Sequence, residues 1–170
     1  PLTTWGDSKY SATEHGTDLL KKMDIPFDYP KSIHAVEDCL RVSGCYYDAT
    51  VLDYFGGSGT TCHAVINLNK EDNGKRKYVL CDMAEYFDVA LRTRAERAIY
   101  SSDWCDGKPQ SRNTGVSQCF KYLRLEQYED TLNNLQVKAP VEDLLSATSE
   151  EFRDSYMLHY MVESEVKSCV

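Results

Sequence analysis

The sequence has 170 residues, enough for one domain of ordinary size. Hydrophobic residues make up 42% of the chain and charged residues 27%, which is close to the globular average and excludes a disordered or collagen-like chain. No run approaches the roughly 18 to 20 apolar residues that cross a bilayer, and the sequence after Pro1 lacks the layout of a signal peptide. We therefore expect a cytoplasmic protein without a membrane partner, and a piece of a longer chain.

The net charge of −8 is concentrated in the last quarter of the sequence. Residues 1–125 carry 16 Lys and Arg against 17 Asp and Glu, whereas residues 126–166 carry 2 against 10. Affinity for phosphates comes largely from Lys and Arg, so the near-neutral first part neither supports nor excludes a nucleic-acid substrate. The charge predicts two regions, 1–125 and an acidic extension over 126–170.

The seven cysteines form no C-x-x-C pair and have no histidine at ligand spacing. A metal site and a disulfide framework therefore both fit poorly, and no metal is predicted. We expect reduced, structural cysteines in a reducing compartment, with Cys62 and Cys81 buried inside apolar runs.

Two helices are predicted before residue 45. Residues 11–22 have Ser and Thr at their start and lysines in their last turn, which is typical of a short helix, and this helix ends before Pro26. Residues 27–30 are expected to be extended, because a residue that precedes proline is kept out of the helical region. Apolar residues then recur at helical spacing over 31–42.

The middle of the chain predicts a βαβα unit with two parallel strands and a right-handed crossover. The expected elements are a strand over 49–55, a glycine turn over 56–61, a helix through 64–68, a strand over 78–81 and a helix over 85–100. The helix over 85–100 has an apolar face formed by Phe87, Leu91, Ala95 and Ala98. We interpret Arg92, Arg94 and Arg97 as its solvated side, with contacts to DNA phosphates as the alternative.

The rest of the chain is predicted to be loop and helix. Residues 101–117 are rich in Ser, Gly, Asn and Pro and indicate a loop. Aromatic and polar residues alternate over 118–125, which favours a half-exposed strand. Acidic helices are expected over 126–135, 141–147 and 150–166.

The glycine turn and Asp82 together indicate a nucleotide-type pocket. Three glycines between a strand and a helix let the backbone approach a ligand, and the helix N-terminus adds free amides and a positive dipole end. An acid that ends the next strand can bind ribose hydroxyls.

Three ligand classes compete for this pocket. A P-loop requires a lysine after its last glycine, but residues 60–62 are Thr, Thr and Cys. A dinucleotide fold prefers a third glycine where Cys62 stands, which weakens that alternative without abolishing it. S-adenosylmethionine fits best, because its carboxylate and sulfonium suit an acidic strand end and amide donors.

The segment Asp53–Thr61 resembles the first cofactor motif of the modification subunits of type III restriction-modification systems, which are adenine-specific DNA methyltransferases. That motif is usually Asp-x-Phe-Ala-Gly-Ser-Gly-Thr-Thr, so Gly56 in place of Ala is a mild departure. Residues 27–32 are similar to the segment that precedes this motif in enzymes of permuted order, and residues 121–134 to a stretch typical of these subunits. The resemblance is to the C-terminal half of the family and covers roughly residues 3–136.

The resemblance implies an α/β fold, part of a Rossmann-like S-adenosylmethionine-dependent methyltransferase, with a helical acidic C-terminal extension. It implies transfer of a methyl group from S-adenosylmethionine to the exocyclic amine of adenine in duplex DNA. The implied partners are duplex DNA bound by the full-length enzyme, the missing N-terminal catalytic half, a restriction subunit and a second copy in a homodimer.

The predicted cofactor-binding residues lie in the turn and in two flanking segments. They are Lys31, Ser32, Asp53, Phe55, Gly57, Ser58, Gly59, Thr60 and Asp82. Asp53 is assigned to the amino-acid end of the cofactor, with a cap on the following helix as its alternative. Asp82 is assigned to the ribose, with a surface turn as its alternative. Lys31 and Ser32 are assigned to the methionine moiety, and Lys31 is otherwise an exposed lysine at a helix start.

The Asp-Pro-Pro-Tyr motif that carries the chemistry of this family is absent, because none of the five prolines is adjacent to another. We therefore predict no catalytic residue and no activity of the chain alone. Residues 24–27, Asp-Ile-Pro-Phe, have a similar composition but run directly into the 31–42 helix, so we interpret them as a helix-ending loop. His63 is interpreted as structural, since methyl transfer from a sulfonium needs no histidine base. An interaction module with a vestigial cofactor pocket is the alternative function.

Overall fold

The computed structural model of the chain describes residues 5–111 and 113–134. The chain divides by its internal contacts into two units, Pro1–Phe120 and Lys121–Val170. The elements in chain order are the 3-10 helix η1 (Ser8–Tyr10), the π-helical turn η2 (Thr13–Thr17), α1 (Asp18–Lys22), α2 (Ile33–Val42), β1 (Thr50–Asp53), α3 (Thr60–Asp72), β2 (Lys77–Leu80), the 3-10 helix η3 (Glu85–Phe87), the π-helical turn η4 (Asp88–Arg92), α4 (Thr93–Tyr100), β3 (Trp104–Cys105), β4 (Lys108–Pro109) and α5 (Tyr128–Asn134).

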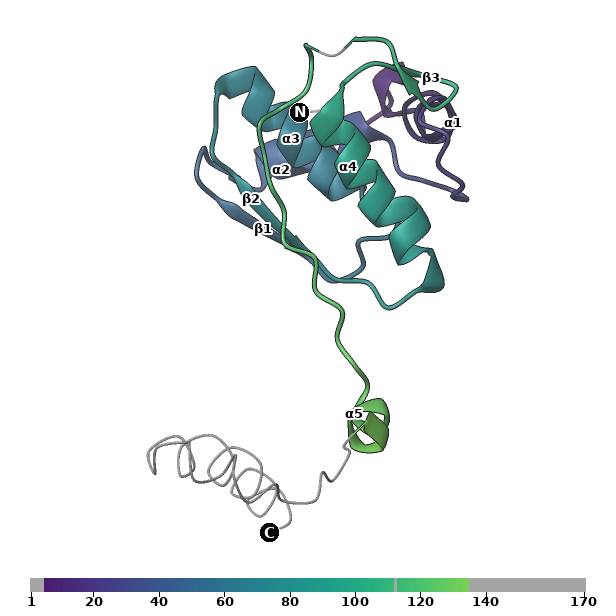
Figure 1. The fold of residues 1–170 in the computed structure, drawn as a ribbon. Helices are drawn as coiled ribbons and strands as arrows, with labels where there is room; N and C mark the ends of the chain where they lie inside the picture. The colour runs from purple at the N-terminus through teal and green to yellow at the C-terminus, as the bar shows by residue number, and fades with distance from the viewer. Residues whose placement is uncertain (1–4, 112, 135–170) are drawn as a thin grey trace. The chain divides into compact units, whose positions relative to one another are not determined.

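Strands β1 and β2 pair in parallel, as predicted, with Thr50 opposite Lys77. Parallel strands need a long crossover, and α3 provides it. Side chains alternate along both strands between half-buried and exposed positions. The helices of the unit Pro1–Phe120 lie on one side of the pair (Figure 1), and Leu52 and Val79 on its other face are 51% and 48% exposed.

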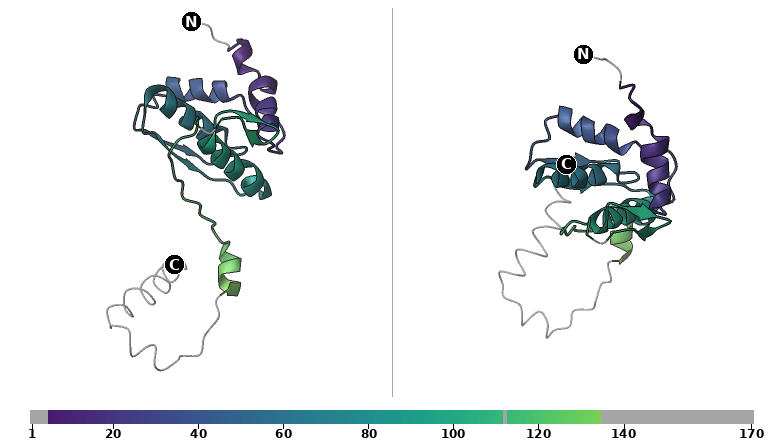
Figure 2. Two further views of the ribbon diagram at one scale, coloured as in Figure 1. Left: turned by 45° about the horizontal axis from the view of Figure 1, so that its top comes forward. Right: turned by 90° about the horizontal axis from the view of Figure 1, so that it is seen from above.

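Helix α3 is the centre of the unit Pro1–Phe120 and packs against both α2 and α4 (Figures 1 and 2). Its buried residues are Thr60, Cys62, His63, Ala64, Val65, Ile66 and Leu68. The predicted burial of Cys62 is confirmed, but the predicted burial of Cys81 is wrong. Cys81 directly follows β2 and continues its alternation of side chains, so it shares the exposed face of Val79, which no helix of the described residues covers.

The predicted helices before residue 45 are present, with small shifts. The 11–22 prediction corresponds to η2 and α1, and α2 begins at Ile33 because Ser32 is its N-cap residue in an extended conformation. The predicted helix over 85–100 is a continuous helical run that passes from η3 through η4 into α4.

A separate apolar cluster joins the N-terminal helices to the segment that leads into α4. It consists of Leu20, Met23, Ile25 and Ala90, with Leu19, Phe27 and Trp104 packed against it. Trp104 comes from β3, which pairs with β4 in a short antiparallel hairpin inside the region predicted as loop. Asp106 and Gly107 at its tip have positive φ angles of 48° and 71°, as a two-residue hairpin turn of this hand requires.

The segment after the hairpin is extended and crosses three elements of the same unit. The Val116 amide donates to the Ile99 carbonyl at 2.8 Å, and Lys70 Nζ donates to the Thr114 carbonyl at 2.6 Å. Gln118 Nε2 donates to the Tyr78 hydroxyl at 3.2 Å. These contacts fix its path over α4, α3 and β2.

The strand predicted over 118–125 is wrong, because these residues pair with no strand of the described chain. Helix α5, described by itself, covers the central part of the helix predicted over 126–135. The helices predicted over 141–147 and 150–166 lie outside the described residues. None of the helices that the structure describes is long and apolar enough to span a bilayer.

Candidate cofactor site

The turn between β1 and α3 depends on glycine at three positions. Gly57 and Gly59 have φ angles of +53° and +75°, a left-handed conformation that residues with a side chain avoid. Gly56 accepts a bond from the Gly59 amide at 2.8 Å and donates its own amide to the Cys81 carbonyl at 3.0 Å. A Cβ atom at Gly56 would lie 2.5 Å from Leu91 Cδ1, so the alanine of the usual motif would require Leu91 to move in this chain.

Asp82 holds this turn from the end of the neighbouring strand. Its Oδ2 accepts the Gly57 amide at 2.8 Å, and its Oδ1 accepts the Ala84 amide at 2.9 Å. The side chain is half-buried, and each carboxylate oxygen has a second lone pair that these bonds leave unused. The carboxylate can therefore stabilise the turn and still accept a ligand hydroxyl.

Asp53 joins the end of β1 to the start of α3. Its Oδ1 accepts the Phe55 amide at 3.0 Å, and its Oδ2 accepts the Thr61 hydroxyl at 2.6 Å. Asp53 therefore contacts the first turn of α3 through the Thr61 side chain, whereas the N-cap residue of α3 is Gly59 and no side chain caps it. Thr61 was not among the predicted site residues, although it directly follows them.

Ser58 and Thr60 are buried beneath the turn, where their hydroxyls lie 3.1 Å apart. Arg94 Nη1 donates to Ser58 Oγ at 3.1 Å and to Thr60 Oγ1 at 2.9 Å. The interpretation of Arg94 as a solvated residue is therefore wrong, since its side chain is 0% exposed. Arg94 lies on the same helical face as residues 91, 95 and 98. The helical spacing that predicts this apolar face therefore also places Arg94 on it.

His63 completes the group beneath the turn. Its Nδ1 accepts a bond from Arg94 Nε at 3.3 Å, which requires that nitrogen to be unprotonated. Burial, and then the neighbouring guanidinium, lower the pKa of His63 well below its ordinary value, while burial lowers the pKa of Arg94 to about 10. At neutral pH the pair is thus a neutral imidazole and a charged guanidinium, which agrees with a structural His63.

Aromatic side chains border the turn. The Phe27 ring would lie 3.7 Å from a Cβ at Gly57, and it packs edge-on against Tyr86 with 5.0 Å between ring centroids. Phe55, next to Gly56, is 85% exposed. The turn therefore has polar backbone amides and exposed aromatic surface side by side.

The structure brings only part of the predicted 27–32 segment to the turn. Phe27 contacts it, whereas Ser32 is buried and donates its hydroxyl to the Lys9 carbonyl at 3.0 Å. Lys31 is exposed, and no hydrogen bond within the described residues joins either residue to the turn. The position of Ser32 just before α2 does not predict this contact, because Lys9 lies in a distant segment of the sequence.

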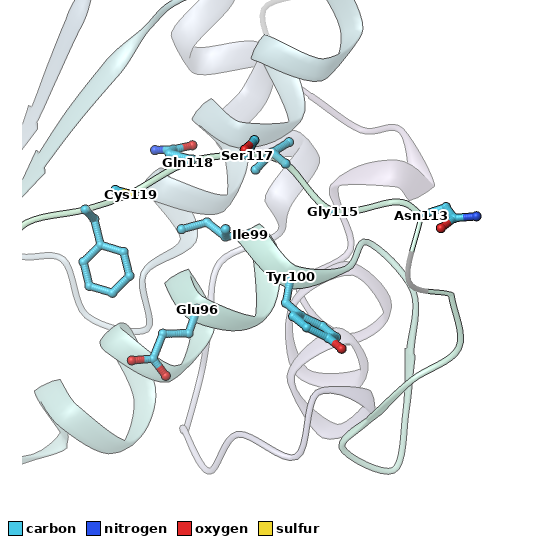
Figure 3. A pocket seen from close by; sticks show the side chains of 10 residues that line it. Glu96, Ile99, Tyr100, Asn113, Gly115, Ser117, Gln118 and Cys119 are labelled. Carbon is cyan, nitrogen blue, oxygen red and sulfur yellow. The ribbon is translucent and has the colours of Figure 1, made fainter.

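Two cavities of the described residues lie away from the turn. One of about 690 Å³ lies between α4 and the segment 113–120 (Figure 3), and one of about 460 Å³ lies between α4 and the β3–β4 hairpin. Neither is lined by the glycine turn or by Asp82. The candidate site is therefore defined by backbone geometry and polar contacts at the surface of the unit Pro1–Phe120.

The chain is similar to known restriction-modification enzymes over part of its length. It is 37% identical over 105 residues to the type III restriction-modification enzyme StyLTI Mod subunit of Salmonella typhimurium. It is 38% identical over 84 residues to the type II methyltransferase M.KpnI of Klebsiella pneumoniae, and 35% identical over 80 residues to the type III EcoPI Mod subunit of Escherichia phage P1. These matches cover 60%, 47% and 46% of this chain but only 15%, 19% and 12% of the relatives.

The chain thus spans less than a fifth of the length of the curated relatives that it matches. Residues 2–92, which include the glycine turn and Asp82, match the family described as DNA methylase. The resemblance to type III modification subunits is confirmed by the named relatives. This chain belongs to the DNA methylase family.

Proposed function

We propose that this chain is the S-adenosylmethionine-binding part of a site-specific DNA adenine methyltransferase of a restriction-modification system. Such an enzyme methylates the exocyclic amine of adenine in duplex DNA. The observation that carries the proposal is the turn after β1, which contains two left-handed glycines, Gly57 and Gly59, and in which the Gly57 amide donates to the carboxylate of Asp82. In open parallel sheets this edge, at the carboxyl ends of the strands, is where ligands bind.

The residues at the turn suit the proposed cofactor. Asp82 can accept ribose hydroxyls with its remaining lone pairs, and Phe55 offers an exposed aromatic face for the adenine ring. Asp53 lies at the strand end that would face the amino-acid end of the cofactor. Backbone atoms of Gly57 and Gly59, unshielded by side chains, can approach the ligand closely.

S-adenosylmethionine supplies a methyl group that its sulfonium already makes electrophilic. The work of the protein is therefore mainly to orient the two reactants and to exclude water. The turn and Asp82 fix the position of one reactant. This chain has no Asp-Pro-Pro-Tyr motif. The residues that hold the flipped adenine would therefore come from another part of the enzyme.

The proposal extends to the whole enzyme. We propose a Rossmann-like sheet to which β1 and β2 belong, a cofactor-binding region over 1–125 and an acidic helical extension over 126–170. The implied partners are a polypeptide region that carries Asp-Pro-Pro-Tyr, duplex DNA, a restriction subunit and a second modification subunit, in the cytoplasm. The Mod subunits among the relatives support the restriction-modification context.

Calorimetric titration of the 170-residue chain with S-adenosylmethionine and with its demethylated product tests the proposal. We expect saturable one-to-one binding of both. ATP and NAD serve as controls for the P-loop and dinucleotide alternatives, and we expect neither to bind. A chain that bound neither form of the cofactor would overturn the proposed function and favour an interaction module.

A further inference from the structure

Arg94 is the largest fully buried side chain of the described residues, and its partners are all neutral. Its guanidinium donates to the hydroxyls of Ser58 and Thr60 and to the imidazole of His63. No acidic side chain of the described residues forms an ion pair with it, and its Nη2 has no hydrogen-bond partner there. A whole positive charge is therefore enclosed beneath the turn without a counter-ion from the part of the chain that the structure describes.

Packing alone does not explain an arginine at this position. Burial of an unpaired charge is unfavourable, and apolar side chains of similar volume often replace buried charges without loss of stability. The neighbouring positions of the same helical face, Leu91, Ala95 and Ala98, are apolar and buried. A methionine at 94 would continue this face, so apolar packing by itself does not call for a charge at this position.

The contacts of Arg94 show what it can do. Its Nη1 reaches Ser58 and Thr60, the residues on either side of Gly59, whose left-handed conformation forms the turn. Nε of the same planar group is held by His63, one helical turn further along α3. The guanidinium therefore holds the residues on both sides of Gly59 through hydrogen bonds from the buried side of the turn.

We infer that Arg94 is a positioning residue that keeps the Ser58–Thr60 turn in the shape that receives S-adenosylmethionine. The inference rests on the proposed function of this turn. Arg94 itself does not touch the ligand, because its side chain is fully enclosed. It acts through the two hydroxyl-bearing residues that it holds.

The variant Arg94→Met separates this role from a structural one. We expect its thermal midpoint to equal or exceed that of the wild type, while its affinity for S-adenosylmethionine falls on the order of ten-fold. Arg76→Met is the matched control. Arg76 is also buried but lies beyond the other end of α3, in an ion pair of 2.7 Å with Asp72. We expect it to lower the thermal midpoint and to leave the affinity of the folded chain unchanged.

Two further variants keep the test decisive if Arg94→Met fails to fold. Arg94→Lys retains the charge but lacks the planar guanidinium group. Its affinity for S-adenosylmethionine should lie between those of the wild type and Arg94→Met. Thr60→Val removes an acceptor and leaves the arginine in place. In the Arg94→Lys background its effect on affinity should be smaller than in the wild type, because the two residues act through one contact.

Hydrogen exchange of the ligand-free chain gives a readout that does not depend on binding. We expect Arg94→Met to speed exchange of amides 56–63 selectively, and Arg76→Met not to do so. If the wild type took up no S-adenosylmethionine, the proposed function would fail, while exchange would still decide whether Arg94 holds the turn. Wild-type affinity in Arg94→Met, with unchanged exchange over 56–63, would overturn the inference.

Discussion

At the scale of single residues, Asp82 has an observed task and a proposed one, and a mutation would affect both together. If Asp82 binds the ribose as we propose, Asp82→Ala removes a charge-assisted hydrogen bond worth about 1.5–3 kcal/mol, so affinity for S-adenosylmethionine should fall about ten-fold or more. It also removes the acceptor of the Gly57 amide, which loosens the turn. Calorimetric titration measures the affinity.

Asp82→Asn separates these tasks, because its amide oxygen can still accept from Gly57 but it carries no charge. We expect an affinity between those of the wild type and Asp82→Ala. Asp48→Ala is a charge-matched control at an exposed position, and it should bind as the wild type does. An unchanged dissociation constant in Asp82→Ala would refute the role of Asp82.

His63 makes stability depend on pH in a defined direction. Its pKa is lowered in the folded chain, so below about pH 6.5 the unfolded chain binds more protons than the folded one. Stability is fully present above that pH and decreases as pH falls, with a limiting slope of about 1.4 kcal/mol per pH unit. Thermal unfolding between pH 7.5 and 5.5 measures this decrease.

The comparison for this measurement is His63→Asn, whose side-chain oxygen can accept from Arg94 in place of Nδ1. We expect it to lose less stability over the same pH range, because asparagine does not titrate. The other histidines are present in both proteins, so their contribution cancels. Equal pH dependence of the two proteins would show that His63 is not the titrating group.

At the scale of elements, the left-handed conformation of Gly59 allows β1, the turn and α3 to connect. A Cβ at Gly59 would lie 3.2 Å from the Leu91 carbonyl oxygen, and the φ angle of +75° disfavours any side chain. Gly59→Ala should therefore destabilise the chain by about 1–3 kcal/mol in chemical unfolding. Gly6→Ala, with no atom within 4 Å of the added Cβ, should change stability by less than about 0.5 kcal/mol.

The elements also show where local patterns misjudge structure. The Asp106–Gly107 pair is a hairpin signal, yet it lies in a stretch whose composition is that of a loop. The alternation over 118–125 resembles a strand, but no neighbouring strand of the described residues pairs with it. Strand formation needs a partner as well as a pattern, and composition alone does not supply one.

At the scale of the whole molecule, we predict that the 170-residue chain alone transfers no labelled methyl groups to duplex DNA above background at saturating cofactor. The chain lacks Asp-Pro-Pro-Tyr, and residues 24–27 are unsuited to replace it. Ile25 is buried in an apolar cluster, and Phe27 packs against Tyr86. The side chains of Ile25 and Phe27 are therefore already engaged in packing within the unit Pro1–Phe120.

A separate polypeptide that carries Asp-Pro-Pro-Tyr should restore methylation when it is mixed with the chain. The variant Asp24→Ala is the control, and it should leave the restored activity unchanged. Incorporation by the chain alone that Asp24→Ala abolished would show residues 24–27 to be a catalytic motif.

The sequence alone determined the local elements and the family. Apolar runs, glycine positions and helical spacing specify backbone conformation over a few neighbouring residues, so β1, the turn, α3 and β2 were predicted in order and in parallel. The motif Asp53–Thr61 with Asp82 identified the family for the same reason, because its residues are close along the chain.

Only the tertiary structure decided which side chains are buried and which atoms they meet. The charge of Arg94 predicts a solvated residue, yet its partners Ser58 and Thr60 lie more than thirty residues earlier. The hydroxyl of Ser32 donates to the Lys9 carbonyl, a contact that the local pattern does not reveal. The apolar run around Cys81 predicts burial, but Cys81 is exposed at the end of β2. Burial and partnership depend on segments distant in sequence, and a local pattern carries no information about what packs against it.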